Sequence, residues 1–184
     1  AGGRTGGISS GALSEWSDRQ DVSALAEAVE AVDAGKNEYA KAYLLGMIKR
    51  QSGKYGQAEK FFARARELKK DFIPAYIEQA KSLLIDRKWN EVLAVVDEAL
   101  EHSKPSGGLL YMKGVAQYQL NDLEQAKETL KRGRELNPDS GEISLALAKV
   151  FLKQHEPAGA ISMLKEVLSR KFTGRDTLGQ VVSI

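Results

Sequence analysis

The sequence lacks cysteine altogether and has only two histidines among its 184 residues. The absence of cysteine excludes disulfide bonds, iron–sulfur ligation, thiolate zinc sites and cysteine nucleophiles. His102 and His155 have no recurring aspartate or serine constellation near them, which favours two surface or helix-end histidines over a catalytic or metal-binding role. We therefore expect a protein that is not an enzyme and that has no catalytic residues, no metal site and no cofactor.

The sequence also lacks a large net charge and long hydrophobic runs. The 27 Lys and Arg nearly balance the 25 Asp and Glu, so the sequence has no broad basic field of the kind that binds nucleic acid. The longest apolar runs, such as Leu93 to Val96, are far below the ~18–20 residues that cross a bilayer, and no membrane insertion is expected. The first 16 residues lack the apolar stretch of a secretory signal, which leaves the cytoplasm and a bacterial periplasm open as compartments.

The glycines near the start of the chain do not form a phosphate-binding loop. Such a loop needs a lysine followed by serine or threonine after its last glycine, and none follows Gly11. We interpret residues 1–20 as a flexible Gly/Ser-rich segment that precedes the folded part.

A 34-residue repeat is what the sequence does have. Small or bulky residues recur at this spacing in three columns: Gly46, Ala80, Gly114 and Ala148; Ala58, Val92, Ala126 and Ala160; and Phe62, Val96, Leu130 and Leu164. Within a repeat, Ala58, Phe62, Ala65 and Leu68 follow a helical rather than a strand period. A turn signal such as Gly53-Lys54 separates the first two columns, so each repeat is expected to be a helix, a tight turn and a second helix.

These residues resemble the tetratricopeptide repeat family, whose clearest marks here are the small-residue columns, the Gly53-Lys54-Tyr55 turn and Pro138. The resemblance implies an all-α protein of the α–α superhelix class, a right-handed solenoid of helix-turn-helix repeats. It covers four repeats, at 39–72, 73–106, 107–140 and 141–174. Three residues depart from the pattern: Gln79 and Lys113 replace the large apolar residue that usually precedes the small one, and Gly133 stands where alanine is usual. These departures do not change the expected fold.

Partial repeats are expected on both sides of the four. Residues 21–38 are similar to the second helix of a preceding repeat, since Ala24, Ala28 and Ala31 lie 34 residues before Ala58, Phe62 and Ala65. Residues 175–184, with Leu178, Val181 and Val182, are similar to the start of a further helix or a C-terminal cap. We therefore expect a segment of a longer array, and self-association through apolar helix faces at both ends stays open.

The resemblance also implies a concave groove lined by the first helix of each repeat. Its inner-face positions in this sequence hold Tyr43, Met47, Arg50, Ile77, Lys81, Leu84, Tyr111, Val115, Tyr118, Leu145, Lys149 and Leu152. The expected groove is mostly apolar and aromatic with a few cations. Tyrosine is favoured at binding surfaces because it joins a large apolar body to a polar tip, so Tyr43, Tyr111 and Tyr118 are the strongest candidates for contact with a partner.

A protein–protein interaction scaffold is the function that the resemblance implies, with the groove binding a peptide or helix of another protein in a larger assembly. The partner segment is expected to be apolar or amphipathic. Two roles stay open for the basic residues, which either pair with acidic side chains of that segment or are solvated surface charges: Arg50, Lys81, Lys149 and Lys153. In family members that hold the tail of a chaperone, five inner-face positions carry a clamp of lysine, arginine and asparagine. Only Lys81 fits that clamp, so such capture is not expected.

Two other functions stay open. One is a chaperone or assembly factor for secretion, pilus or exopolysaccharide export. The other is an RNA-binding helical repeat, which is less favoured because a code of one base per repeat needs recurring polar pairs. The corresponding register holds apolar side chains, namely Tyr43, Ile77, Tyr111 and Leu145.

Overall fold

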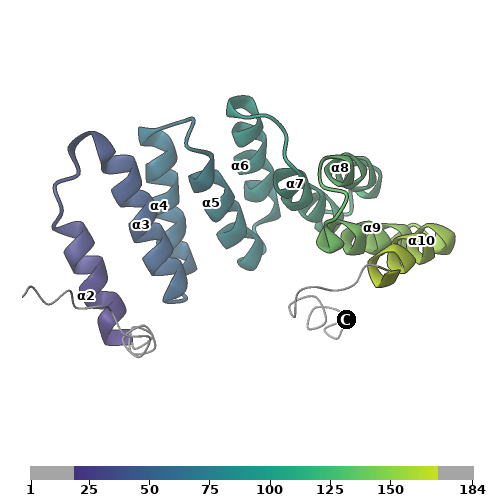
Figure 1. Cartoon of the computed structure of the whole chain (residues 1–184), viewed down its shortest axis with the longest axis horizontal. Helices are drawn as coiled ribbons and strands as arrows, with labels where there is room; N and C mark the ends of the chain where they lie inside the picture. The colour runs from purple at the N-terminus through teal and green to yellow at the C-terminus, as the bar shows by residue number, and fades with distance from the viewer. Residues whose placement is uncertain (1–18, 170–184) are drawn as a thin grey trace, which may run out of the picture. The chain divides into compact units, whose positions relative to one another are not determined.

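The computed structural model describes residues 19–169, which form nine α-helices, one 3₁₀ helix and no strand. The expectation of an all-α protein is therefore confirmed for this part of the chain. The elements are α2 (Arg19–Glu30), η1 (Gly35–Asn37), α3 (Glu38–Gln51), α4 (Tyr55–Leu68), α5 (Ile73–Ile85), α6 (Trp89–His102), α7 (Gly107–Gln119), α8 (Leu123–Leu136), α9 (Gly141–Lys153) and α10 (Pro157–Ser169) (Figure 1).

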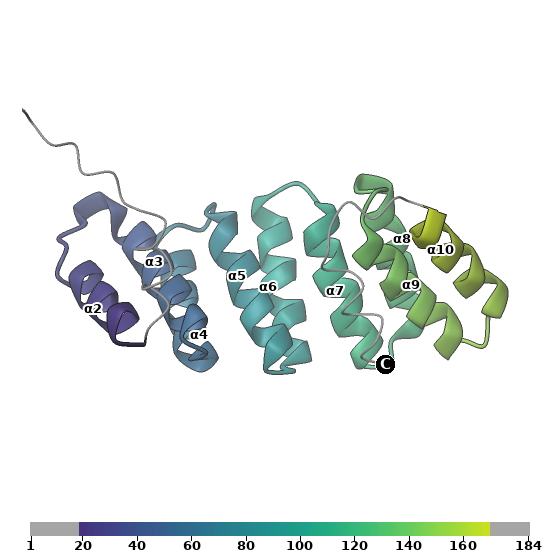
Figure 2. The same ribbon diagram turned by 60° about the horizontal axis from the view of Figure 1, so that its bottom comes forward.

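The helices after η1 come in pairs joined by short turns: α3 with α4, α5 with α6, α7 with α8, and α9 with α10 (Figure 2). The assignment of these pairs to repeats 39–72, 73–106, 107–140 and 141–174 remains an assignment from the sequence. The chain divides into two compact units, Ala1–Ala75 and Tyr76–Ile184, each of which is described by itself below.

In the first unit, α3 packs against α4 and α2 packs against α3. The ring of Tyr43 lies beside two other aromatic rings. The distance between ring centroids is 5.8 Å to Phe62 and 5.2 Å to Phe72. Gly46 lets these helices approach closely, because a Cβ atom there would stand 2.5 Å from Cε1 of Phe62. The core of this unit thus combines small residues of α3, α4 and α5, namely Ala42, Ala65 and Ala75, with the aromatic rings of Tyr43 and Phe72.

The first described helix ends before the end of the segment that the sequence assigned to it. The sequence predicts a helical segment over 21–38, whereas α2 ends at Glu30 and a 3₁₀ turn at Gly35–Asn37 leads into α3. Ala26 is the buried alanine of α2, and Ala24, Ala28 and Ala31 are exposed. The described neighbour of α2 is α3.

In the second unit, successive helices from α6 to α10 pack against one another, and α7 also contacts α9. Gly114 on α7 repeats the role of Gly46, since a Cβ atom there would stand 2.5 Å from Cγ of Leu130. The core around this contact is aliphatic and runs through four helices: Ala126, Leu130, Ile143, Leu147, Ala148, Val150, Ala160 and Met163.

Each turn within a pair contains one residue with positive φ, and these residues are again 34 apart: Gly53 (71°), Arg87 (57°), Asn121 (70°) and His155 (62°). In the first turn the amide of Gly53 donates to the carbonyl of Arg50, and the amide of Lys54 donates to that of Lys49, both at 2.9 Å. The other three turns have the same two bonds at the equivalent positions. This is the Schellman motif, which ends a helix with a left-handed residue.

Capping explains where several helices begin and end. The hydroxyl oxygens of Ser106 and Ser140 accept hydrogen bonds from the amides of Leu109 and Ile143, both at 3.3 Å, at the starts of α7 and α9. Pro157 opens α10 in the first turn, where its missing N–H costs nothing. Of the expected segment 1–20, residues 1–18 lie outside the described residues, and Arg19 and Gln20 begin α2. The expected segment 175–184 also lies outside the described residues.

Candidate functional site

The predicted groove residues lie on the first helix of each pair, with three on each of α3, α5, α7 and α9. None of the twelve is buried. Lys81, Lys149 and Leu152 are exposed, and the other nine are partly exposed. The structure therefore places them where a partner could reach them, and no described contact identifies such a partner.

The helices α7 and α9 bring six of these residues onto neighbouring elements of the second unit. We call this set the α7–α9 face and define it by Tyr111, Val115, Tyr118, Leu145, Lys149 and Leu152. Tyr111 and Tyr118 pack partly against the aliphatic core beneath them, which holds their rings in place. Leu152 is 56% exposed, a large fraction for a leucine in the middle of a folded unit.

Each of the two tyrosines of this face has a charged side chain close to its ring. The ammonium group of Lys153 lies 4.7 Å from the centroid of the Tyr118 ring, which is cation–π geometry. Burial, reinforced by the nearby carboxylate of Glu142, raises the pKa of Tyr111 above its usual 10.0. Tyr111 therefore stays a neutral hydrogen-bonding phenol throughout the physiological pH range.

The predicted residues on α3 belong to the other unit and are largely occupied by internal contacts. Tyr43 packs between Phe62 and Phe72, as described above, and Nη2 of Arg50 lies 3.7 Å from the sulfur of Met47. The prediction that Tyr43 is a prime contact residue is not tested by these contacts, but they show that much of its ring surface serves the fold.

On α5, the one cation that fits the family's chaperone-tail clamp has a carboxylate beside it. The ammonium group of Lys81 is 2.8 Å from Oε1 of Glu78, one helical turn earlier. Glu78 is buried, with 7% of its surface exposed, so Lys81 compensates a carboxylate that the protein itself supplies.

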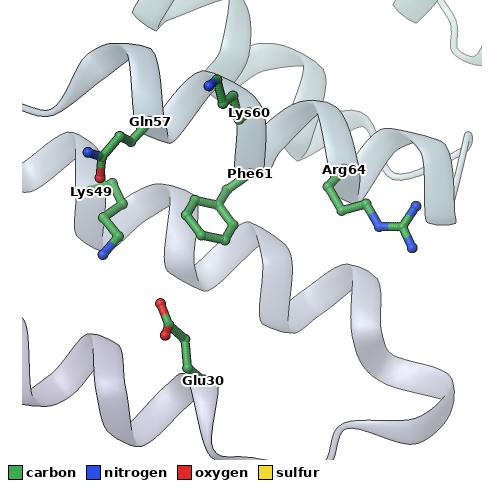
Figure 3. Close-up of a pocket in the computed structure, with 6 residues that line it drawn as sticks. All are labelled: Glu30, Lys49, Gln57, Lys60, Phe61 and Arg64. Carbon is green, nitrogen blue, oxygen red and sulfur yellow. The ribbon is translucent and has the colours of Figure 1, made fainter.

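An open depression of about 390 Å³ in the first unit was not anticipated from the sequence. Figure 3 shows the Phe61 ring and the Glu30 carboxylate facing each other across it, with Lys49 nearby. Gln57, Lys60 and Arg64 complete its lining, and Arg64 also pairs with Glu67 at 3.1 Å. No sequence signal could have indicated it, because it depends on how far α2 stands from α4.

Features of other functional classes are few in the described part of the chain. Residues 19–169 contain no group of three or more His, Cys, Asp or Glu side chains arranged to hold a metal ion. None of the described helices combines the length and hydropathy needed to cross a membrane. His102 ends α6, where its ring lies 6.3 Å from that of Tyr76, and His155 is an exposed turn residue.

Comparison with known proteins adds to this geometry. No curated protein matches the sequence significantly. Structures with the same fold include MamA residues 41 to the end from Desulfovibrio magneticus RS-1, at 17% identity and a TM-score of 0.73, covering 84% of this chain and 88% of that chain.

Two further structures are of proteins with peptide ligands in their descriptions. YrrB, described as a tetratricopeptide repeat protein with an unusual peptide-binding site, has 22% identity and a TM-score of 0.65 over 77% of this chain and 74% of its own. The first repeat domain of Spaghetti (RPAP3), bound to an HSP90 peptide, has 18% identity and a TM-score of 0.62 over 65% and 95%.

Two sequence models of the tetratricopeptide repeat family match this chain, one at residues 40–72 and the other at residues 83–150. These matches and the shared fold agree with the helix pairs and the glycine contacts described above. The chain belongs to the tetratricopeptide repeat family.

Proposed function

We propose that this protein is a non-catalytic interaction scaffold that binds a peptide or helix of a partner protein on the α7–α9 face. The observation that carries the proposal is the row of large apolar side chains that α7 and α9 leave partly or fully exposed on adjacent helices. Soluble proteins rarely leave such residues together at the surface without a partner. The folded core beneath fixes the tyrosine rings, so binding would cost little side-chain entropy.

The chemistry of the face favours an amphipathic ligand with acidic side chains. Tyr118 and Leu152 supply apolar area, while Lys149 is an exposed cation on the same helix as Leu152. A ligand carboxylate could pair with Lys149 and an apolar ligand side chain could lie on Tyr118. The predicted residues on α3 and α5 remain candidates for the same role.

The described relatives support the class of function and leave the partner unidentified. YrrB and the RPAP3 domain both carry peptides or peptide sites in their descriptions and share the fold of this chain. At 22% and 18% identity they carry no information about which peptide this chain binds.

A photocrosslinking experiment tests the proposal directly. A benzophenone amino acid placed at Lys149 on the α7–α9 face should trap a partner protein in extract of the source cells. The same amino acid at Glu128, an exposed residue of α8, is the matched control and should not trap it. Equal trapping at both positions would contradict binding at this face.

A second measurement asks whether the apolar side chains supply the affinity. The double variant Tyr118→Ala/Leu152→Ala should weaken binding of the trapped partner at least ten-fold, because two large contacts are removed. The control Leu44→Ala/Leu136→Ala removes two leucines that are each 51% exposed elsewhere, and it should bind as the wild type does. Unchanged binding by the first variant would rule out this face.

A further inference from the structure

The open depression in the first unit is lined by residues of three helices, α2, α3 and α4. Its volume of about 390 Å³ is in the range of clefts that hold ligands in proteins. Four of its six lining residues belong to α4, the second helix of its pair, and none of the six is among the twelve predicted groove positions. The depression is therefore separate from the α7–α9 face.

The walls of the depression are mostly apolar. Phe61 is partly exposed, and Figure 3 shows its ring pointing from α4 toward Glu30 on α2. Lysine and arginine side chains cover apolar surface with their aliphatic stems while their charged groups stay in water. The depression thus offers apolar surface to a large side chain, and charged groups lie around it.

These charged groups are predominantly positive. Lys49, Lys60 and Arg64 are cations, whereas Glu30 is the only carboxylate among the six lining residues. Arg64 is paired with Glu67. In the part of the chain that the structure describes, no acidic side chain lies within salt-bridge distance of Lys49 or Lys60. Both ammonium groups are therefore available to a carboxylate of a ligand.

The sequence around the depression has the same sign of charge. Residues 36–75 contain ten Lys and Arg but four Asp and Glu, although the whole chain contains 27 and 25. A local excess of one sign attracts ligands of the opposite sign and speeds their association. The first unit is thus suited to an acidic partner.

The other helix pairs lack this combination of residues. The counterparts of Lys49 and Lys60 carry no positive charge and those of Phe61 are not aromatic, in the same order: Leu83, Gln117 and Phe151; Ala94, Glu128 and Ser162; Val95, Thr129 and Met163. In α7 and α8, the side chain of Gln117 donates to that of Gln125 at 3.3 Å and joins the two helices. An aromatic ring between two cations is therefore particular to the pair α3–α4.

We propose that this depression binds an acidic segment of a partner protein. One large apolar side chain of the segment lies on Phe61, and its carboxylates pair with Lys49 and Lys60. A polypeptide fits better than a nucleic acid, because its amide groups can donate to Glu30, whereas each nucleotide would bring a further negative phosphate toward that carboxylate.

A nuclear magnetic resonance titration of the isotope-labelled full chain tests the proposal. The probe is the peptide acetyl-Glu-Glu-Phe-Glu-Glu-amide, which should shift the backbone amide signals of residues 57–64. Alanine in place of phenylalanine should weaken binding about five-fold, because the apolar contact is lost. Lysine in place of glutamate should weaken it about ten-fold. Equal binding of the three peptides would overturn the proposal.

Variants of the protein separate this site from general attraction. Lys60→Glu should weaken binding of the probe about five-fold, because a carboxylate replaces a contacting cation. Lys131→Glu on α8 changes the net charge equally and should leave binding unchanged; both lysines are exposed. Equal weakening by the two variants would contradict binding at the depression.

A gain of binding is also expected. Glu30→Gln removes the one carboxylate of the lining and should strengthen binding of the acidic probe about two-fold, a result that loss of folding cannot produce. Unchanged or weaker binding by this variant would contradict the proposal.

Other occupants give other outcomes. A short single-stranded RNA, or inorganic phosphate alone, that shifts the signals of residues 57–64 at lower concentration than the peptide does would overturn the proposal. Absence of shifts with every probe would overturn it too. The amide signals of α7 and α9 report on the α7–α9 face separately, and Tyr118→Ala/Leu152→Ala should leave the shifts at 57–64 unchanged. Failure of one site is thus distinguishable from failure of the other.

Discussion

The pairs α3–α4 and α7–α8 achieve the same close approach of two helices with different side chains. In both pairs a glycine faces a bulky residue 16 positions later, and its missing Cβ leaves the room that the bulky residue fills. The bulky residue is the aromatic ring of Phe62 in the first pair and the branched chain of Leu130 in the other. The repeats that carry Ala80 and Ala148 instead have Val96 and Leu164 at the second position.

This difference teaches that the combined volume of the two facing side chains is constrained more tightly than the volume of either one. Phe62 and Leu130 are fully buried opposite glycine, and Val96 is fully buried in the repeat with alanine. Leu164, in the repeat with Ala148, is 37% exposed on α10, whose described neighbour is α9. Substitutions along these columns can therefore separate packing within a pair from covering by the next pair.

Truncation of the bulky residue should have the largest effect. Leu130→Ala is expected to lower the free energy of unfolding by about 2–5 kcal/mol, because it opens a cavity in a fully buried site. Leu164→Ala should cost clearly less, since 37% of that side chain is already in contact with solvent. Chemical denaturation followed by circular dichroism measures both, and equal losses would mean that burial does not decide the cost.

Addition of a methyl group at the glycine should have the next largest effect. Gly114→Ala places a Cβ atom 2.5 Å from Cγ of Leu130, and we expect a net loss of about 1–2 kcal/mol after the better helix propensity of alanine is counted. Gly108→Ala on the same helix meets no atom within 4 Å and should gain about 0.5–1 kcal/mol. Thermal unfolding of the two single variants is the measurement, and stabilisation by both would contradict the close approach.

The left-handed turn residues offer a smaller comparison between repeats. Arg87 has φ of 57°, a conformation that strains a residue with a Cβ atom, so Arg87→Gly should stabilise the protein by about 0.5–1 kcal/mol. Gly53→Ala, at the equivalent place with φ of 71°, should destabilise it by a similar amount. If the turns are equivalent, the denaturation midpoint should rise in Arg87→Gly and fall in Gly53→Ala, relative to the wild type.

The smallest expected effect concerns pH. Because the pKa of Tyr111 is higher in the folded protein than its usual 10.0, the folded state retains a proton that the unfolded state loses. Stability should therefore fall as the pH rises above about 10, and less steeply in Tyr111→Phe. Glu142→Gln should lower the pKa of Tyr111 but not restore it fully, since burial is the larger cause. Ultraviolet titration of the phenolate measures this pKa.

The repeat made most of the fold predictable, because four copies of one spacing constrain each other. The paired helices after residue 38 and the start of α10 at Pro157 follow from the sequence. The end of α2 at Glu30 and the 3₁₀ turn at Gly35–Asn37 do not follow from the repeat, because this segment precedes the first full copy. Leu68 shows a second limit: it shares the helical period of Ala58 and Phe62 but is 40% exposed near the end of α4.

The polar residues in the columns were harder to anticipate. Lys113 stands where the repeat pattern has a large apolar residue, and its ammonium group lies 2.6 Å from Oδ1 of Asp97 on α6. Gln79 is buried, and among the described residues no donor reaches its Oε1. A spacing pattern shows that a polar residue departs from the repeat, but only the neighbouring helices decide whether it is satisfied.

The candidate site was predictable as a set of positions and not as a surface. The family register placed all twelve residues outside the buried core, yet it could not show that Tyr43 spends much of its ring on Phe62 and Phe72. The depression beside Phe61 had no signal at all, because it arises from the separation of helices rather than from any residue type.

The four Schellman turns have a consequence for how such a protein can change. Their hydrogen bonds join main-chain atoms, so the side chains at Arg87 and His155 contribute nothing to those bonds. None of the four turn residues belongs to the twelve candidate contact positions. Substitutions at these four turn residues can thus change the thermal stability of the protein without altering any of the twelve candidate contact side chains. Selection and protein engineers therefore have two separate sets of positions to change.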